Sequence, residues 1–353
     1  MPLTVLSVAY PLARVSEATA GGAEQVLLTI DRALVEWGHR SLVLAAADSR
    51  CNGLLLPVQI PSGNLDERAK LESRRQFREA LNHALDRYSI DVIHMHGIDF
   101  NEYLPDCEVP VVVTLHLPLA WYSPKAFQFR RQNIHLVCVS QAQARTAPAG
   151  MHIEHTIPNG VQLDQFHLAR RKGSYVLFMG RICPEKGVHL AMEAAQRAGT
   201  RLLIAGTVFD YPEHREYFET RVRPQLGSNA ASLGAVGGER KAELLAGAKC
   251  LLIPSSARET SSLIAMEALA SGTPVIAWRS GALPEIVSDG RTGFVVSSIQ
   301  ELSDAIVRVS DLSSWECRVE AERRFSSMTM TSAYFALYDE AVRSARLPEL
   351  QAA

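Results

Sequence analysis

The stretch YVLFMGRICPEKGVHLAMEAAQRAGTRLLIAGT, residues 175–207, contains two strand patterns joined by a turn and a helix pattern. YVLFMG and RLLIAGT are short, continuous apolar runs, which are typical of strands buried on both faces of a parallel sheet. The segment between them, GVHLAMEAAQRAG, has the length of a helix. A strand, a crossover helix and a second strand form a parallel βαβ unit. This stretch therefore predicts an α/β fold.

Strand and helix patterns alternate over most of the chain. In the first half, helix patterns at residues 23–38 and 67–88 separate apolar strand patterns, which lie at residues 3–9, 41–46, 91–97, 109–116 and 135–140. In the second half, helix patterns at residues 238–249 and 261–272 separate further strand patterns, which lie at residues 250–255, 274–278 and 293–296. This βαβα order predicts two doubly wound, Rossmann-like domains.

The length of the chain also favours two domains, because 353 residues exceed the usual size of one hydrophobic core. Residues 155–174 contain Pro-Asn-Gly followed by a polar, basic stretch, which is typical of a linker. We therefore predict an N-terminal domain at residues 1–168 and a C-terminal domain at residues 169–328. After residue 298 the strand patterns stop and three helix patterns follow. The last of them occupies the C-terminal segment, residues 329–353, and places Tyr334 and Tyr338 on one helix face.

The composition excludes several classes of protein. With 47% hydrophobic and 21% charged residues and a formal net charge of −2, the chain offers no basic face for a nucleic acid, so no nucleic-acid partner is expected. The six cysteines are far apart and form no CxxC pair, which argues against a disulfide framework or a zinc site. This pattern favours the reducing cytosol.

The sequence predicts a cytoplasmic protein without a transmembrane segment. No apolar run approaches the ~20 residues that a membrane span needs. The N-terminal MPLTVLSVAYP lacks the basic region of a signal peptide, so we interpret it as a first strand. The basic helix pattern at residues 73–87 and the segment at residues 127–132 are candidates for peripheral contact with an anionic membrane. Charges of this kind more often form a solvated helix face.

The turn within GRICPEKG, residues 180–187, carries two cations at the carboxyl end of a predicted strand. Open α/β sheets bind their ligands at this edge. Arg181 offers a planar fork to phosphate oxygens, and Lys186 offers a compact point charge. The alternative is a solvated loop with two ordinary surface charges.

The second candidate segment is ETSSLIAME, residues 259–267. Thr260 or Ser261 is expected to cap a helix that runs to about Ser271, followed by Gly272 at a left-handed turn. Glu267 lies beside the predicted apolar face of this helix, where a carboxylate usually has a partner. Glu259 lies just before the helix, whose free amides favour an anion such as a pyrophosphate. The alternative for these carboxylates is a purely structural hydrogen bond to nearby backbone.

Weaker signals lie in the N-terminal half. Gly21 and Gly22 open the first predicted helix, where a backbone without side chains can approach a phosphate or a sugar. The full G-x-G-x-x-G pattern is absent, so a dinucleotide site is not supported. His116 ends the strand pattern VVVTLH at a carboxyl edge. His94 and His96 share one side of a strand without a third metal ligand, so we interpret them as packing or hydrogen-bonding residues.

The chain contains no Asp-x-Asp pair. Transferases that depend on Mg²⁺ or Mn²⁺ usually need such carboxylates beside the diphosphate. Arg181, Lys186 and a helix N-terminus are expected to stabilise a departing diphosphate instead. No metal ion is expected at this site.

Together these residues resemble glycosyltransferase family 4, whose members are retaining enzymes with the GT-B fold. The resemblance runs from GGAEQVLL (21–28) through IPNGVQLDQF (157–166) and GRICPEKG to the Glu-x7-Glu pair and GALPEIVSDGRTGFVV (281–296), in the family's order. It covers nearly the whole chain. It implies a GT-B fold with two Rossmann-like domains, a deep cleft between them, and a last helix that crosses back to the N-terminal domain.

The resemblance also implies roles for the residues that match. Arg181 and Lys186 are expected to bind the donor diphosphate, Glu259 to hold hydroxyls of the transferred sugar, and Glu267 to hold the ribose. In the N-terminal, acceptor-binding domain, the resemblance implies that His116 lines the sugar pocket near the reacting carbon. It also implies that Gly21 and Gly22 contact the diphosphate or the acceptor. Arg181, Lys186, Glu259 and His116 are the expected catalytic residues.

One departure from the family pattern lies between the two glutamates. Family members commonly carry an aromatic residue and a glycine there, whereas this chain reads Thr260, Ser261, Ser262 and Leu263. Serine lacks the freedom of glycine at positive φ. We therefore expect the backbone donors around the sugar to be arranged differently, or a hydroxyl to contact the sugar directly.

The expected activity is transfer of a hexose, glucose from UDP-glucose, without a cofactor and with the nucleotide sugar as co-substrate. The alternatives are a GDP-mannose-dependent mannosyltransferase, a nucleotide-sugar epimerase or phosphorylase on the same scaffold, and a non-catalytic nucleotide-sugar binder. The acceptor can be a small molecule, a glycan or a lipid, because variable loops select it. The motifs do not specify an oligomeric state.

Overall fold

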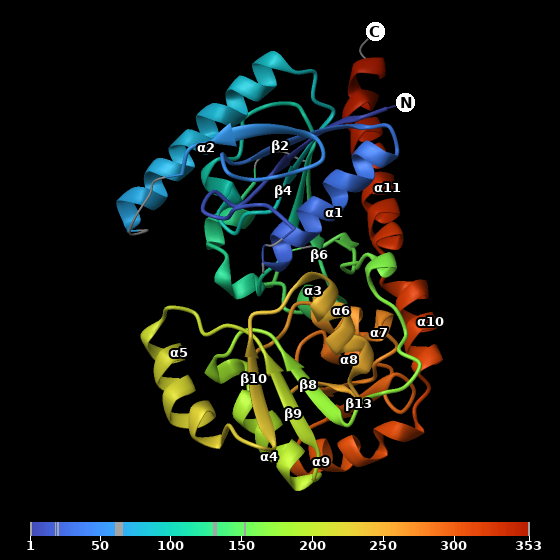
Figure 1. The fold of residues 1–353 in the computed structure, drawn as a ribbon. Coiled ribbons are helices and arrows are strands. Elements are labelled where there is room, and N and C mark those ends of the chain that lie inside the picture. The colour runs from blue at the N-terminus through green and yellow to red at the C-terminus, as the bar shows by residue number, and fades with distance from the viewer. Residues whose placement is uncertain are drawn as a thin grey trace. The chain divides into compact units, whose positions relative to one another are not determined.

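The computed structural model describes residues 2–17, 19, 21–60, 66–129, 133–151 and 153–351. These residues form two compact units (Figure 1). Unit 1 contains Met1–Pro158 and Met330–Ala353, and unit 2 contains Asn159–Thr329. The division lies earlier in the chain than residue 168, because Val161 and Phe166 are buried in the hydrophobic core of unit 2. Residues 130–132 of the candidate membrane segment and residues 352–353 of the C-terminal segment lie outside the described ranges.

Unit 1 is built on a parallel sheet of seven strands in its described part, in the order β3-β2-β1-β4-β5-β6-β7. The strands are β1 Thr4–Val8, β2 Arg40–Ala46, β3 Leu54–Val58, β4 Val92–Met95, β5 Val111–Leu115, β6 Ile134–Cys138 and β7 His155–Thr156. The four residues of β4 and the five of β5 are all buried. This burial explains the continuous apolar runs in the sequence, because helices cover both faces of the sheet.

The helices of unit 1 pack on both faces of its sheet, so that the sheet divides the core into two layers. They are α1 Gly22–Glu36, α2 Glu67–Arg87, α3 Gln141–Ala144 and the part of α11 (Ser327–Gln351) that belongs to this unit. Apolar residues of α2 pack on one face of the sheet. Those of α1 and α11 pack on the other face, where Tyr334 and Tyr338 are fully buried. The expected pairing of these two tyrosines on one helix face is confirmed.

Unit 2 repeats this plan with a parallel sheet of six strands in the described chain, in the order β10-β9-β8-β11-β12-β13. The strands are β8 Tyr175–Met179, β9 Arg201–Ala205, β10 Ala230–Gly234, β11 Leu251–Ile253, β12 Val275–Trp278 and β13 Gly293–Val296. The helices are α4 Val188–Arg197, α5 Pro212–Tyr217, α6 Gly238–Gly247, α7 Leu263–Ala270, α8 Leu283–Ile286, α9 Ile299–Arg308 and α10 Ser314–Arg324. The predicted pair of doubly wound α/β domains is confirmed.

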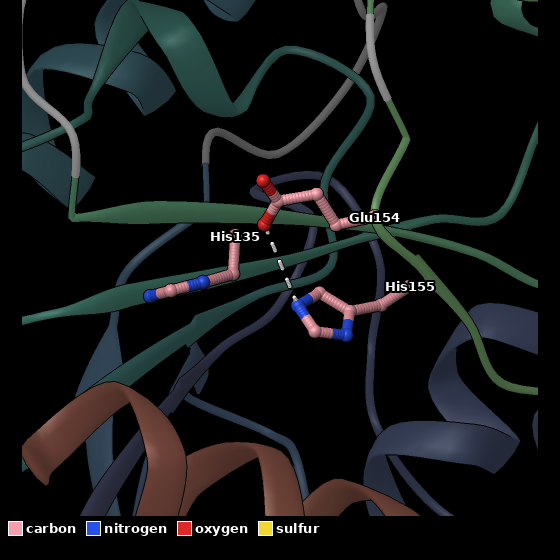
Figure 2. Close-up of side chains that lie close together, drawn as sticks. All are labelled: His135, Glu154 and His155. Carbon is pink, nitrogen blue, oxygen red and sulfur yellow. Dashed lines mark ion pairs between the residues drawn. The ribbon is translucent and has the colours of Figure 1, made fainter. Parts of the chain in front are cut away.

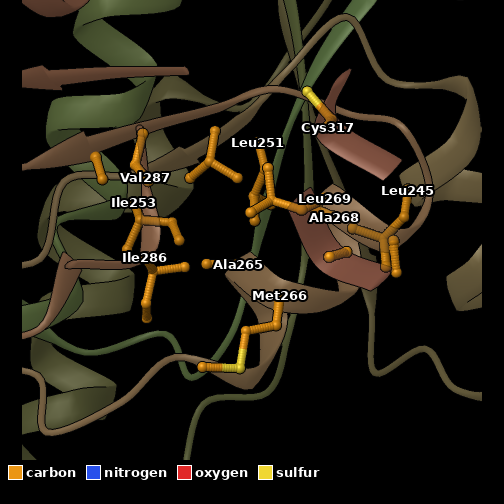
Figure 3. Close-up of a cluster of buried hydrophobic side chains, with 14 of the residues drawn as sticks. Leu245, Leu251, Ile253, Ala265, Met266, Ala268, Leu269, Ile286, Val287 and Cys317 are labelled. Atoms are coloured by element: carbon orange, nitrogen blue, oxygen red, sulfur yellow. The ribbon is translucent and has the colours of Figure 1, made fainter. Parts of the chain in front are cut away.

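The core of unit 2 also has two layers. Helices α4 and α9 pack on one face of the sheet, and α6, α7 and α10 pack on the other. Figure 3 shows the second layer, in which Ala265, Met266 and Leu269 of α7 lie against apolar residues of β11 and α8. The position of α7, which carries one candidate glutamate, is therefore set by its apolar face.

Three strands were not expected from the sequence, and all three lie at edges of the sheets. Pro57 lies within β3, where its missing N–H is tolerated because an edge strand pairs on one side only. β10 has the sequence AASLG, whose small and polar residues lack a strand signal. β7 contains two residues. These three edge strands are less buried than the central strands β4 and β5.

Two further expectations have a clear outcome. The cap of α7 was placed at Thr260 or Ser261, which is wrong: Ser262 caps this helix, and its side chain accepts a hydrogen bond from the amide of Ala265. The glycine turn after the helix is confirmed, since Gly272 has φ +65°. The six cysteines all lie within the described residues and form no disulfide bond there. In the part of the chain that the structure describes, no helix is long and apolar enough to cross a membrane.

Candidate active site

The candidate donor site lies at the switch point of the sheet in unit 2. The chain runs from β8 outward to β9 on one side, and β11 is the neighbour of β8 on the other side. The loops that follow β8 and β11 therefore diverge from adjacent strand ends. Doubly wound sheets bind their ligands at this point. Arg181 and Lys186 lie in the first loop, and Glu259 lies in the second.

Close backbone contacts fix the loop after β8. A side chain at Gly206 would place its Cβ 1.9 Å from the carbonyl oxygen of Gly180, so the ends of β8 and β9 can approach only because residue 206 is a glycine. The loop continues through a short 3₁₀ turn, Pro184–Lys186, to Gly187 at φ +69°. A Cβ on Gly187 would lie 2.3 Å from the carbonyl oxygen of Pro254. The loop therefore requires glycine at two close approaches.

Hydrogen bonds join this loop to the loop after β11. The backbone carbonyl of Glu185 accepts bonds from the amide of Ser256 at 2.9 Å and from the hydroxyl of Ser255 at 3.2 Å. Ser255 also donates to the carboxylate of Glu259, with a distance of 2.7 Å to Oε1. Ser255 is thus a bridge between the two loops.

Lys186 and Glu259 form an ion pair across the two loops. Lys186 Nζ lies 2.5 Å from Glu259 Oε1, and the side chains are 24% and 15% exposed. Partial burial strengthens a charge-assisted bond and at the same time makes an unpaired partner costly. The pair places a cation and a carboxylate side by side at the strand ends. A phosphate can approach the ammonium, and sugar hydroxyls can approach the carboxylate.

The backbone of Glu259 is held by a third loop. Its carbonyl oxygen accepts a hydrogen bond from the amide of Ala282 at 2.8 Å. Gly281 has φ +53°, and a Cβ there would lie 2.2 Å from the same carbonyl oxygen. The hydroxyl of Ser280 donates to the carbonyl of Ala257 at 2.6 Å. The segment before α8 therefore supports the position of Glu259 from behind.

Arg181 is exposed, and its guanidinium lies 5.5 Å from the centre of the Phe209 ring. Such a cation–π contact restrains a long side chain without using the hydrogen bonds of its guanidinium. The N–H groups of Arg181 can therefore still bind phosphate oxygens. Arg181 and Lys186 belong to the same loop, so both cations serve one end of the site.

Glu267 forms a separate ion pair within unit 2. Its Oε1 lies 2.6 Å from Nζ of Lys241 on α6, and the Glu267 side chain is 9% exposed. Burial raises the pKa of the Glu267 carboxyl, and the ammonium of Lys241 opposes this shift. Lys241 also lies 5.7 Å from the centre of the Phe166 ring. The partner of the buried Glu267 carboxylate is therefore the side chain of Lys241, and not nearby backbone.

The segment that departs from the family pattern lies between the two ion pairs in the sequence. Ser262 is used as the cap of α7, and Leu263 is the first residue of the helix. Leu263 packs partly against the apolar layer that contains α7. The hydroxyl oxygen of Ser261 is buried and has no hydrogen-bond partner among the described residues. A buried hydroxyl without a hydrogen-bond partner costs free energy. The hydroxyl of Ser261 is therefore a group that a bound ligand could stabilise by a hydrogen bond.

Gly21 and Gly22 lie in unit 1, at the start of α1. Gly21 precedes the helix with φ −74°, so left-handed backbone is not the reason for a glycine here. A Cβ on Gly21 would lie 1.9 Å from a carboxylate oxygen of Glu24, which folds back over the first turn. Burial raises the pKa of the Glu24 carboxyl, and a bond to its own backbone opposes the shift. Glu24 is therefore a polar group at this helix start that the sequence did not single out.

His116 lies in unit 1 after β5 and belongs to a row of three histidines. His116 Nε2 lies 3.0 Å from His96 Nδ1, and the two rings stack. His94 is bonded through its two nitrogens to Tyr338 and Thr114, at 2.7 Å each. Burial lowers the pKa of His116 to about 3, so its ring is neutral at pH 7. The prediction that His94 and His96 are hydrogen-bonding residues is confirmed.

The structure thus brings some candidate residues together. Within unit 2, the loops after β8 and β11 bring Lys186 against Glu259, while Glu267 is held in its own pair with Lys241. His116, Gly21 and Gly22 belong to unit 1. Two residues of these pairs, Ser255 and Lys241, are not among the candidates that the sequence indicates. Ser255 has a usable signal because it is the last residue of a strand pattern, whereas Lys241 is a helix lysine without a distinguishing signal.

Two family models match the chain. The model of glycosyltransferase family 4 matches residues 20–165, and the model described as glycosyl transferases group 1 matches residues 173–311. The chain belongs to glycosyltransferase family 4. It is therefore an enzyme that transfers a glycosyl group, and the family resemblance in the motifs is confirmed.

Two curated relatives with known names are similar to this chain. The phosphatidyl-myo-inositol mannosyltransferase of Mycobacterium tuberculosis strain H37Rv is 26% identical over 310 residues, which cover 78% of this chain and 79% of the relative. The D-inositol 3-phosphate glycosyltransferase of Mycobacteroides abscessus is 30% identical over 223 residues, which cover 57% and 49%. The two relatives are thus glycosyltransferases that are named for different compounds.

Solved structures agree with the fold. A glycosyltransferase involved in avilamycin A biosynthesis, AviGT4, superposes with a TM-score of 0.72 and 27% identity over 97% of this chain and 98% of its own. The sucrose-phosphate synthase of Thermosynechococcus elongatus superposes with a TM-score of 0.78 and 19% identity, over 97% of this chain and 100% of its own. This chain has two Rossmann-like sheets and superposes on both structures over nearly its whole length, so the expected GT-B fold is confirmed.

Proposed function

We propose that this glycosyltransferase moves a hexose, glucose from UDP-glucose, with retention of the anomeric configuration and without a metal ion. The observation that supports the donor site best is the Lys186–Glu259 pair at the ends of β8 and β11. The bond from the anomeric carbon to the diphosphate oxygen breaks during transfer, so negative charge develops on the diphosphate. Lys186 and Arg181 would stabilise this charge, and Glu259 would hold sugar hydroxyls.

Metal-free catalysis is supported by the partners of the carboxylates. Glu259 is paired with Lys186, and Glu267 is paired with Lys241. A carboxylate that already binds an ammonium is a poor ligand for Mg²⁺, which would need that oxygen for itself. The sequence also lacks an Asp-x-Asp pair. Full activity in EDTA is the expected result, and a strict requirement for Mg²⁺ or Mn²⁺ would contradict this part of the proposal.

Mannose transfer from GDP-mannose is the second candidate, and one observation favours it. The relative of Mycobacterium tuberculosis named phosphatidyl-myo-inositol mannosyltransferase is 26% identical over 78% of the chain, whereas the structure named with UDP-glucose is 19% identical. The Thr260–Ser262 segment differs from the usual family pattern where the sugar is recognised, so neither sugar follows from the motif itself. The nucleotide base is likewise open to a direct test.

A donor panel separates these candidates. The thermal midpoint is measured with UDP, GDP and ADP, and with UDP-glucose, GDP-mannose and ADP-glucose, because a ligand that binds the folded state raises the midpoint. The donor that gives the largest rise is then incubated with extracts of small molecules, glycans and lipids, and products are found by mass spectrometry. Transfer of glucose from UDP-glucose supports the proposal. Transfer from GDP-mannose alone would make GDP-mannose the donor in place of UDP-glucose. Binding of a donor without any product would favour a non-catalytic nucleotide-sugar binder.

A further inference from the structure

We propose that His135, Glu154 and His155 in unit 1 bind a divalent transition-metal ion of the zinc class. One ligand atom from each residue lies within 4.8 Å of the ligand atoms of the other two. Figure 2 shows the three side chains on neighbouring segments of the sheet, with Glu154 facing the ring of His155. This cluster lies outside the candidate donor site and does not depend on the proposed function.

The sheet register places the two imidazoles on one face. β6 and β7 are parallel neighbours, and Val137 of β6 is paired with His155 of β7. His135 lies two residues before Val137, and side chains two residues apart in a strand share a face. The rings of His135 and His155 are accordingly 6.0 Å apart between centres. Val137 itself packs in the core layer that contains α11, so the two histidines extend this buried face toward solvent.

Two carboxylates place negative charge near His135. Glu154 and Glu340, which lies on α11, both act electrostatically on the His135 ring. Their negative charges favour a cation at this position.

The donor set indicates which ion would bind. Two imidazole nitrogens and one carboxylate oxygen are a common set for Zn²⁺, with a water in the fourth position. Bond lengths of about 2.0–2.2 Å require ligand atoms roughly 3.4 Å apart in a tetrahedron. The His155 Nε2 and Glu154 Oε2 atoms are already 3.8 Å apart. The Glu154 side chain is 62% exposed, so it can rotate the remaining distance without disturbing the core.

The second cluster of this kind in the described chain is Cys183, Glu185 and His214 in unit 2. Burial is the largest cause that raises the pKa of the Cys183 thiol to about 12, so the thiol holds its proton at neutral pH. A metal would have to displace that proton from a buried site. His135 and His155 are half-buried and Glu154 is exposed, so an ion can reach them without opening the core, which makes them the stronger candidates. His214 then supplies a matched control.

Metal binding at this position would stabilise the pairing of β7, the last strand of the unit 1 sheet, with β6. β7 contains two residues, and its hydrogen bonds to β6 are correspondingly few. His155 and Glu154 lie on this strand and directly before it, while His135 lies on β6. An ion that bridges them would add a cross-link at the edge where the chain leaves unit 1 at Pro158.

Calorimetric titration of the full chain with ZnCl₂ tests the proposal, after treatment with EDTA and buffer exchange. The variants are His135→Ala, His155→Ala and Glu154→Gln. The controls are His83→Ala, an exposed histidine on α2 of the same unit, and His214→Ala in the second cluster. The wild type is expected to bind Zn²⁺ in the micromolar range. Each ligand variant is expected to weaken binding by at least about tenfold, and each control to remain within about twofold.

Two further measurements keep the result decisive. The thermal midpoint of each metal-free variant shows whether it is folded, and His155→Ala and Glu154→Gln decide the outcome if His135→Ala does not fold. Co²⁺ in place of Zn²⁺ is expected to give the intense visible absorption of a four-coordinate site in the wild type only. Binding that is absent in the wild type, unchanged in the ligand variants, or lost in His214→Ala would overturn the assignment.

Discussion

Lys186 Nζ lies 2.5 Å from Glu259 Oε1, although 73 residues separate the two in the sequence. The contact exists because β8 and β11 are neighbours in the sheet while the chain between them forms β9 and β10 elsewhere. Parallel order thus brings a cation from one loop and a carboxylate from another to the same sheet edge. Substitutions at this pair therefore test the proposed donor site most directly.

Replacing Lys186 by methionine should lower kcat/KM by roughly 100-fold, about the loss seen when one group that stabilises transition-state charge is removed. The methionine keeps the volume of the side chain but leaves Glu259 with Ser255 as its remaining partner. Steady-state kinetics with the donor found in the panel measure the effect. Lys249→Met, at an exposed lysine of the same unit, is the control and should retain wild-type kinetics. Wild-type activity in Lys186→Met would remove this lysine from the mechanism.

Lys241→Met should destabilise unit 2 by about 3 kcal/mol, because it leaves the Glu267 carboxylate buried without its cation. The double variant Lys241→Met, Glu267→Leu should recover most of this loss, since it removes the unpaired charge as well. Urea unfolding compares the two proteins. If Glu267 binds the ribose, the double variant should still bind UDP at least about tenfold more weakly than the wild type. Normal UDP affinity in the stable double variant would limit this pair to a structural role.

Ser261→Gly should separate recognition of the sugar from recognition of the nucleotide. The Ser261 hydroxyl has no partner among the described residues, so its removal should not cost the stability of a hydrogen bond. If the hydroxyl contacts the sugar, the Kd for the nucleotide sugar should rise by about tenfold while the Kd for the nucleoside diphosphate stays unchanged. Isothermal titration with both ligands measures the difference. Equal changes in the two affinities would argue against a role in reading the sugar.

Much of the fold could be predicted from the sequence, for a physical reason that also explains the omissions. Central parallel strands are buried on both faces, so β4 and β5 appear as continuous apolar runs. In two edge strands this pattern is interrupted or weak. Pro57 interrupts the apolar run of β3, and Leu233 is the one large apolar residue of β10, so the sequence alone indicates neither strand. The sequence therefore predicts the centres of both sheets better than their edges.

The candidate site could be predicted where its residues follow strand ends. Arg181, Lys186 and Glu259 lie in the loops that follow strand patterns, and parallel strands bring such loops to one edge. Lys241 could not be found in this way, because its position is set by the packing of α6 against α7. The cap of α7 was misplaced because three consecutive hydroxyl residues, Thr260 to Ser262, are all good caps, and only backbone geometry selects one.

Acid should destabilise unit 1 below pH 6.5. Burial lowers the pKa values of His94, His96 and His116 below the ordinary value of 6.5. The unfolded chain therefore binds protons at these residues that the folded unit does not bind. The stabilisation that these neutral histidines contribute is complete above pH 6.5. It is lost progressively as the pH falls from 6.5 toward their lower pKa values in the folded unit. The ordinary pKa values of Asp and Glu lie below pH 5, so carboxylates contribute less to the change in stability between pH 6.5 and 5. The change in this range therefore comes mainly from the histidines.

Tryptophan fluorescence can follow this loss. Trp278→Phe and Trp315→Phe remove the two tryptophans of unit 2, so the remaining signal comes from unit 1. Urea midpoints are then compared at pH 6.5 and pH 5. In the same background, His96→Gln should reduce the acid-dependent shift because one buried histidine no longer titrates. A shift of the same size in both proteins would show that His96 does not contribute to it.

Gly281→Ala should impair activity although residue 281 is not expected to touch the substrate. The glycine has φ +53°, and an added Cβ would lie 2.2 Å from the carbonyl oxygen and 2.5 Å from the amide nitrogen of Glu259. Both atoms are backbone and cannot rotate away, so Glu259 must move relative to Lys186. A displacement of this kind at a positioned group lowers kcat/KM by about 100-fold.

Gly290→Ala is the matched control for this substitution. Gly290 has φ +73°, and a Cβ added there would meet no atom of the described chain within 4 Å, so alanine suffers the same backbone strain without a clash. Both variants should lose about 1–2 kcal/mol of stability from left-handed backbone, as urea unfolding can measure. Only Gly281→Ala should lose activity, and its thermal response to the nucleotide sugar should fall with it. Equal activity in the two variants would mean that the loop before α8 does not position Glu259 for catalysis.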